Sequence, residues 1–124
     1  MIGAGAVADY HHVPGIHVAP RAELDAVCDP NEVLLEQRIG DWGVSRTTTE
    51  FQEIADADDI DAVIIATPNF THRPITLACV AAGKHVMCEK PLGLSFEESA
   101  EMYRAARDAA VSYTHLTLPT SDLV

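Results

Sequence analysis

The sequence of 124 residues is poor in basic residues and has no long apolar run. Eight lysines and arginines stand against nineteen aspartates and glutamates, which gives a formal net charge of -11. A surface of that sign repels phosphate groups, so it argues against a nucleic-acid partner and against an anionic membrane surface. The stretches AVIIA and ITLACVAAG are too short to span a bilayer, and the first residues lack the basic segment and apolar core typical of a signal peptide. We therefore expect a cytoplasmic protein with no membrane partner.

Cysteine is scarce and shows no metal-binding spacing. Cys28, Cys79 and Cys88 each lie in an apolar run, and no two of them form a C-x-x-C pair. We expect reduced packing residues rather than disulfides or zinc ligands. His11 and His12 are adjacent, but neighbours on a helix diverge by about 100°, so they make a poor bidentate site. The sequence predicts no metal site.

Short β-type runs alternate with helical segments, which is typical of a parallel sheet with helices on both faces. The expected strands are residues 1–2, 23–29, 61–67 and 84–89, and the expected helices are residues 30–40, 50–57, 71–83 and 95–109. The helix bounds come from Asp29 as a cap before Pro30, from possible capping boxes at Thr47-x-x-Glu50 and Ser95-x-x-Glu98, and from Gly83 as a C-terminal stop. The order predicts an α/β Rossmann-type doubly wound parallel sheet.

Both ends indicate an incomplete domain. The first strand has only Met1 and Ile2, where a strand usually has about five residues, which suggests a misplaced start. Residues 111–120, VSYTHLTLPT, abandon the helical pattern and can be back-translated into one frame of a transposase-type sequencing adapter. We expect a partial nucleotide-binding domain over residues 1–110 with marginal stability, no second domain, and a non-native tail over residues 111–124. The alternative for the tail is a genuine β segment.

A glycine turn near the start carries the first cofactor signal. Gly3, Gly5 and Ala8 form a G-x-G-x-x-(G/A) arrangement after an apolar residue. Gly3 permits a tight turn, Gly5 lets a pyrophosphate approach the backbone, and Ala8 allows the helix to pack closely on the strand. The N–H groups around Ala6 and Val7 would face the anion at the helix N-terminus. Alone the motif is weak, because glycine- and alanine-rich turns occur by chance.

An acid at the end of the second strand strengthens this interpretation. Asp29 lies 24 residues beyond Gly5, close to the spacing at which an acid meets the adenosine ribose hydroxyls. A carboxylate there would repel a 2'-phosphate and no arginine is adjacent, so NAD is favoured over NADP. The alternative is that Asp29 only caps the next helix, and CDPN fits both roles.

The third strand ends in a Thr-Pro-Asn turn. Thr67 and Pro68 keep the backbone extended beside a cofactor, and Asn69 has the groups to bond its ribose or amide. His72 follows in the next turn. The alternative for Thr67 and Asn69 is ordinary turn and capping chemistry, and for His72 it is a first-turn helix position.

The fourth strand ends in Glu89-Lys90-Pro91. Proline stops the strand and holds the preceding residue extended, so the side chain of Lys90 is fixed at a strand terminus. Ligands of open α/β sheets bind at such termini. A lysine there can offer charge to a developing alkoxide; the alternative is a solvated strand-end lysine.

Together GAGAVA, VCDPN, T-P-N-x-x-H and A-G-K-H-V-x-x-E-K-P resemble the Gfo/Idh/MocA family, over residues 1–109. The resemblance implies a nicotinamide-dependent oxidoreductase acting on sugars or polyols, as a homo-oligomer in its full-length form. It implies that Lys90 lies near the nicotinamide and assists proton transfer as the catalytic residue. Glu89 would position the cofactor and Pro91 would shape the turn. The second domain of the family, with its acid-base histidine and substrate pocket, has no counterpart here, so the fragment alone is expected to be inactive.

Two other classes stay open from the sequence. A stand-alone dinucleotide-binding or regulatory module would share the glycine turn and the acid but not catalysis. A Rossmann-type methyltransferase would share them too, without needing Thr-Pro-Asn or Glu-Lys-Pro.

Overall fold

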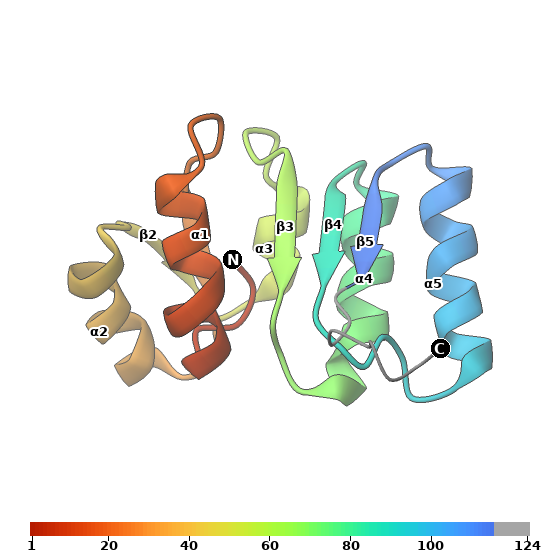
Figure 1. The fold of residues 1–124 in the computed structure, drawn as a ribbon, viewed down its shortest axis with the longest axis horizontal. Helices are drawn as coiled ribbons and strands as arrows, with labels where there is room; N and C mark the ends of the chain where they lie inside the picture. Colours follow the sequence, from red (N-terminus) through yellow and green to blue (C-terminus); the bar gives the residue numbers. More distant parts are fainter. Residues whose placement is uncertain (116–124) are drawn as a thin grey trace, which may run out of the picture.

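The computed structural model describes residues 1–115, along which helices and strands alternate (Figure 1). The strands are β1 (Ala26–Cys28), β2 (Arg46–Thr48), β3 (Ala62–Ile65), β4 (His85–Cys88) and β5 (Tyr113–His115). The helices are the π-helix η1 (Ala8–His12), α1 (Val13–Val18), α2 (Glu32–Trp42), α3 (Phe51–Asp56), the 3-10 helix η2 (Asn69–Thr71), α4 (His72–Ala81) and α5 (Phe96–Asp108).

The strands run parallel in two groups that meet at Ile2. β1 pairs with β2, while β3, β4 and β5 form the other group in that order. Ile2 bridges Cys28 on one side and Ile65 on the other. The spatial order is therefore β2, β1, Ile2, β3, β4, β5, and the prediction of a Rossmann-type parallel sheet is confirmed.

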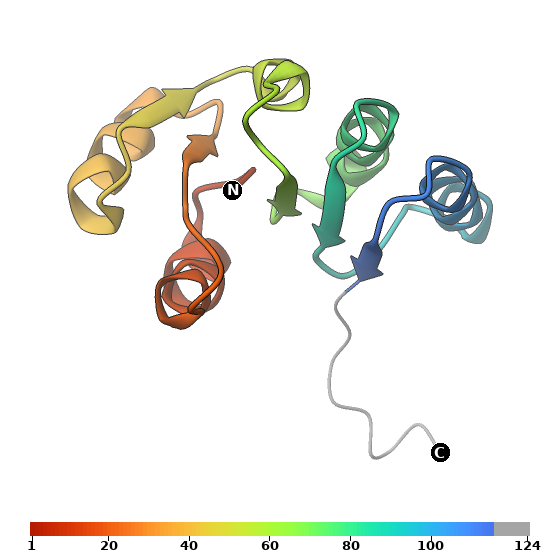
Figure 2. The ribbon, with the colours of Figure 1, turned by 90° about the horizontal axis from the view of Figure 1, so that it is seen from above.

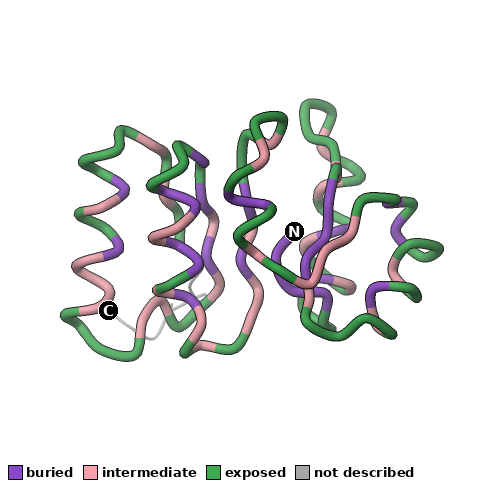
Figure 3. Tube along the Cα trace, turned by 180° about the vertical axis from the view of Figure 1, so that it is seen from behind, coloured by how far each residue is buried: buried purple, intermediate pink, exposed green. Residues whose placement is uncertain are grey.

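Helices cover both faces of the sheet, and each face has its own core. Figure 2 shows α1 on one side of the strands and α3, α4 and α5 on the other. Ala8, Val13, Leu35 and Trp42 belong to the cluster on the α1 side, and the larger cluster includes Ile54, Cys79 and Met102 from α3, α4 and α5. Buried residues follow the central strands (Figure 3), as expected for a sheet covered on both faces.

Two expected helix starts are wrong by one or two residues. The cap of α2 is Asn31, whose side chain accepts a hydrogen bond from the N–H of Leu34 at 3.1 Å, so Asp29 does not cap this helix. Thr47 lies in β2, a strand that the sequence did not reveal because its residues are polar and partly exposed. Thr48 instead accepts from the N–H of Glu50 at 3.1 Å. Tertiary pairing therefore outweighed the local capping pattern.

The last described strand lies in the tail. β5 pairs with β4, and the N–H of Val86 donates to the carbonyl of Ser112 at 2.9 Å. The alternative interpretation of the tail as a genuine β segment therefore describes Tyr113–His115, which form β5. Residues 116–124 lie outside the part of the chain that the structure describes. Strand pairing uses main-chain groups that almost any residue carries, so the non-native origin of residues 111–124 stays a prediction.

The three cysteines are free and buried, as the sequence predicted. Burial raises the pKa of the Cys28 and Cys79 thiols to about 11, which keeps them protonated and unreactive at neutral pH. No helix within residues 1–115 is long and apolar enough to cross a bilayer. The same residues contain no group of three or more metal-ligating side chains.

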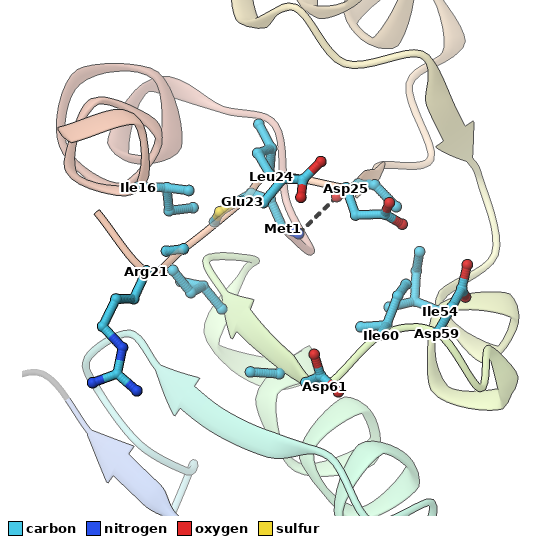
Figure 4. Close-up of a pocket in the computed structure, with 14 residues that line it drawn as sticks. Met1, Ile16, Arg21, Glu23, Leu24, Asp25, Ile54, Asp59, Ile60 and Asp61 are labelled. Atoms are coloured by element: carbon cyan, nitrogen blue, oxygen red, sulfur yellow. Dashed lines mark hydrogen bonds between the residues drawn. The ribbon is translucent and has the colours of Figure 1, made fainter. Parts of the chain in front are cut away.

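A cavity of about 480 Å³ lies at the amino ends of β1 and β3, beside Met1 (Figure 4). Its lining includes Leu24, Ile60 and Ile64. The α-amino group of Met1 is buried here and donates to the carbonyl of Ala26 at 2.8 Å. Burial lowers the pKa of this amine from 8.0 to about 6, because the charged form is poorly solvated.

We expect the stability of the chain to rise between pH 6 and pH 8 through this amine. The unfolded chain binds the proton in that window and the folded chain does not, so the free energy of unfolding increases with pH by up to about 2–3 kcal/mol. The measurement is urea unfolding at pH 6 and at pH 8, followed by Trp42 fluorescence. The Nα-acetylated chain is the control, because it keeps every histidine but has no titrating amine. An equal rise in the acetylated chain would contradict the assignment.

Candidate functional site

The functional residues expected from the sequence gather at one edge of the sheet, where Ile2, β1, β3 and β4 end. This edge is at the bottom of Figure 1, where the arrowheads of β3 and β4 lie. Parallel strands all present their carboxyl ends at the same edge, where open α/β sheets bind ligands. The Met1 cavity lies at the opposite, amino-terminal ends of these strands and is separate from this site.

Gly3 and Gly5 have different environments in the glycine turn. Gly3 has a φ of +103°, and a Cβ added there would lie 2.2 Å from the carbonyl oxygen of Ala66. The turn therefore packs directly on the end of β3, which only glycine permits. A Cβ added at Gly5 would meet nothing within 4 Å, and Gly5 is exposed. The solvent side of the turn at Gly5 is therefore free of other described atoms.

The helix that follows presents its first residues to solvent and packs its next residue in the core. Ala6 and Val7 are exposed, whereas Ala8 is fully buried. This is the arrangement that an anion at a helix N-terminus requires, because the N–H groups stay accessible while the helix packs closely on the sheet.

Asp29 supports the glycine turn from the end of β1. One carboxylate oxygen, Oδ2, accepts from the N–H of Ala4 at 2.9 Å, and Oδ1 accepts from the N–H of Asn31 at 2.9 Å. A carboxylate has about four acceptor positions, so two remain for another donor. Asp29 is half-buried. The structure therefore places an anionic acceptor beside the turn.

The Thr-Pro-Asn turn leads from β3 into η2. Thr71 Oγ1 lies 2.6 Å from both Thr67 Oγ1 and the carbonyl oxygen of Pro68, which fixes the turn. The Oδ1 atom of Asn69 is buried and has no hydrogen-bond partner among the described residues. A buried acceptor without a donor is costly, so this atom fits a site that a ligand donor completes.

His72 joins the ends of β3 and β4 rather than facing solvent. It is 1% exposed. Its Nε2 lies 2.9 Å from the carbonyl oxygen of Thr67, and its Nδ1 lies 2.8 Å from that of Pro91. Both partners are carbonyl oxygens, which accept from a ring N–H of the imidazole. His72 therefore holds two turns of the site together, and its influence on a cofactor passes through those turns.

The Glu-Lys-Pro turn follows β4 and is linked to η1. Glu89 Oε1 lies 2.8 Å from His12 Nε2, and Glu89 Oε2 accepts from the N–H of Lys90 at 3.0 Å. Lys90 and Pro91 are exposed. The ammonium group of Lys90 makes no hydrogen bond or ion pair within residues 1–115, so it is available to a ligand.

Four residues that local sequence patterns did not reveal support the glycine turn or the Glu-Lys-Pro turn. Arg38 Nε donates to the carbonyl of Ala4 at 3.0 Å and its guanidinium lies over the ring of Trp42. Trp42 Nε1 donates to Asp9 Oδ1 at 2.7 Å. The fourth residue is His12. No local motif marks the hydrogen bonds of Arg38, Trp42 and His12, since their partners lie 33 to 77 residues away.

Comparison with known proteins identifies one family and several individual likenesses. A family model described as an oxidoreductase family with an NAD-binding Rossmann fold, GFO_IDH_MocA, matches residues 1–116. The chain is 46% identical over 69 residues to 1,5-anhydro-D-fructose reductase of Ensifer adhaerens, covering 56% of this chain and 21% of that protein. It is 32% identical over 111 residues to scyllo-inositol 2-dehydrogenase (NAD(+)) of Bacillus subtilis, covering 90% and 32%.

The fold is also similar to solved structures. The crystal structure of biliverdin reductase from Synechocystis sp. PCC 6803, in complex with biliverdin and NADP+, matches with a TM-score of 0.86 at 27% identity. The match covers 92% of this chain and 35% of that one. The chain thus spans between 21% and 35% of the length of these three proteins.

We expect Gly3→Ala and Gly5→Ala to separate folding from binding. Gly3→Ala should lower the free energy of unfolding by at least about 2 kcal/mol, because its Cβ meets the backbone of Ala66. Gly5→Ala should leave stability within about 0.5 kcal/mol of the parent chain and weaken dinucleotide binding by at least about tenfold, since its Cβ fills the open space. Urea unfolding and NADH titration measure the two effects.

Gly40→Ala in α2 is the matched control, because a Cβ there also meets nothing within 4 Å. It should keep the NADH affinity of the parent chain and raise the free energy of unfolding by about 0.5–1 kcal/mol, because alanine favours a helix interior more than glycine does. Unchanged NADH affinity in Gly5→Ala would contradict the role of Gly5.

Proposed function

The chain belongs to the Gfo/Idh/MocA oxidoreductase family, and we propose that it is the dinucleotide-binding part of an enzyme that transfers hydride. The substrate of the full-length enzyme is a sugar, a polyol or a related hydroxy or keto compound. One observation carries the proposal: the Asp29 carboxylate is hydrogen-bonded to the glycine turn at the carboxyl edge of the sheet. The turn and the acid are the two parts of a dinucleotide fingerprint, and here they are in contact.

The adenosine half of the cofactor would bind at the glycine turn. The N–H groups of the exposed residues Ala6 and Val7 would receive the pyrophosphate, for which Gly5 leaves room. The free acceptor positions of Asp29 would receive the ribose hydroxyls. Gly3 and Asp29 fix the turn from two sides, which supports binding at this turn with little rearrangement.

The nicotinamide half would lie toward the ends of β3 and β4. Asn69 would use its Oδ1, which has no hydrogen-bond partner within residues 1–115, for a ribose hydroxyl or the carboxamide. It lies beside the turn formed by Thr67 and Pro68. His72 would act through this turn and through Pro91, whose carbonyls it holds. The ordered turns reduce the entropy that binding must otherwise cost.

Lys90 would be the catalytic residue of this part. A bound nicotinamide ring supplies the hydride acceptor or donor. The backbone of Lys90 is held at the end of β4 by Glu89, and the ammonium of this exposed residue would stabilise the developing alkoxide and assist transfer of the hydroxyl proton. The substrate pocket and the acid-base histidine would come from the remainder of a longer protein, since the relatives are about three to five times as long as the matched part. We propose a cytoplasmic homo-oligomer for that protein and little activity for this chain alone.

We further propose NAD rather than NADP as the cofactor. The Asp29 carboxylate would bond the 2'-hydroxyl of the ribose and would repel a 2'-phosphate. One relative carries NAD(+) in its name and one similar structure holds NADP+, so the family fold accommodates both and the preference rests on this side chain.

We expect NADH to bind more tightly than NADPH, and Asp29→Asn to reduce the preference by about tenfold. Asparagine keeps an acceptor for the N–H of Ala4 but removes the charge that repels the phosphate, and a charge-assisted hydrogen bond contributes about 1.5–3 kcal/mol. The measurement is titration of the chain with each cofactor, followed by energy transfer from Trp42. Asp25→Asn is the control, because Asp25 is exposed and lies in the wall of the Met1 cavity.

Tighter NADPH binding by the parent chain would contradict the role of Asp29. Binding of S-adenosylmethionine in preference to either cofactor would instead support a methyltransferase. If a longer protein that contains this chain binds NADH but oxidises or reduces no sugar or polyol, the result would support a regulatory module.

A further inference from the structure

We infer that His12 is a positioning residue for the Glu-Lys-Pro turn, acting on Lys90 through Glu89. The inference deepens the proposed function, since it rests on the placement of this turn beside the cofactor. Its basis is the contact between His12 Nε2 and Glu89 Oε1 at 2.8 Å, which joins two segments 77 residues apart. The His12 side chain is 10% exposed and that of Glu89 is 18% exposed. Water therefore competes little for this bond.

The π-helix brings His12 to the carboxyl edge. The N–H of Val13 donates to the carbonyl of Ala8, five residues earlier, so one turn of this segment contains more residues than an α-helical turn. Ala8 and Val13 are both buried in the same cluster. In an α-helix His12, four residues after Ala8, would share its inward face. Here Val13 takes that place, and His12 is free to reach Glu89 while His11 stays exposed.

Glu89 transmits the position of His12 to the lysine. Its two carboxylate oxygens have separate partners, since Oε1 meets His12 and Oε2 accepts from the N–H of Lys90. With Oε1 held, the carboxylate plane is fixed and Oε2 remains directed at the Lys90 amide. Without His12 the carboxylate would rotate toward solvent, and the backbone of Lys90 would lose this partner.

The arrangement couples the two halves of the proposed cofactor site. Ala6 and Val7, which would bind the pyrophosphate, lie immediately before the π-helix, and His12 ends it. One short helix therefore contacts the phosphate end of the site and, through Glu89, the lysine at the nicotinamide end. Lys90 is positioned relative to the cofactor by the same element that would bind the cofactor.

The test compares His12→Ala, His12→Gln and His11→Ala in the full 124-residue chain. Two readouts are used: the NMR signal and hydrogen exchange of the Lys90 amide, and the affinity for NADH. His12→Ala should shift the NMR signal of the Lys90 amide. It should also raise the hydrogen-exchange rate of this amide and lower the affinity for NADH, each by about two- to tenfold. His12→Gln carries an N–H₂ group at the position of Nε2. It should therefore restore most of the protection of the Lys90 amide and most of the NADH affinity. His11→Ala should change neither.

An unchanged Lys90 amide in His12→Ala would overturn the inference. So would an equal change in His11→Ala, or failure of His12→Gln to restore the amide in a chain that melts like the parent. If His12→Ala does not fold, His12→Leu replaces it, because leucine fills similar space without an N–H donor, and an unchanged Lys90 amide in that variant would overturn the inference. If the parent chain binds neither NADH nor NADPH, the proposed function fails, whereas the amide readout still decides the contact.

Discussion

The structure depends on the main chain of residues 1–3, which joins the two halves of the sheet. Toward β3, the N–H of Ile2 donates to Ile64 and the carbonyl of Ile2 accepts from Ala66, both at 2.8 Å. Toward β1, the N–H of Gly3 donates to the carbonyl of Cys28 at 2.8 Å. These bonds set the ends of β1 and β3 side by side. The chain then leaves the sheet at Gly3, between the two strands, so the glycine turn has only one place to lie.

From this point the site is assembled by polar side chains that bind main-chain groups. Asp29 holds the amide of Ala4, and His72 meets the carbonyls of Thr67 and Pro91. Each side chain ties the end of one strand to the turn beside it. The same residues form the family motif, so this motif determines how the turns fold at the carboxyl edge of the sheet. A substitution at His72 would therefore affect binding through geometry, although its ring is buried.

The sequence predicted what depends on neighbours in the chain and missed what depends on distant partners. The glycine turn and the strands β3 and β4 were expected because their signals are local: small residues in a fixed spacing and apolar runs. β2 was missed because Arg46–Thr48 is a short polar segment whose place in the sheet comes from pairing with β1. The π-helix has no compositional signal, and the contact of His12 with Glu89 joins residues 77 positions apart. Such contacts follow from the fold, which local patterns do not contain.

Two lysines bracket β4, and their surroundings separate structure from chemistry. Lys84, before the strand, is 6% exposed and its ammonium donates to the carbonyl of Ala57. That cation is already satisfied and stabilises the amino-terminal side of the sheet. Lys90, after the strand, is exposed, and its ammonium has no partner within the described residues. A lysine whose backbone is held and whose ammonium has no protein partner can act on a ligand. Of the two lysines beside β4, only Lys90 at the carboxyl end meets both conditions within residues 1–115.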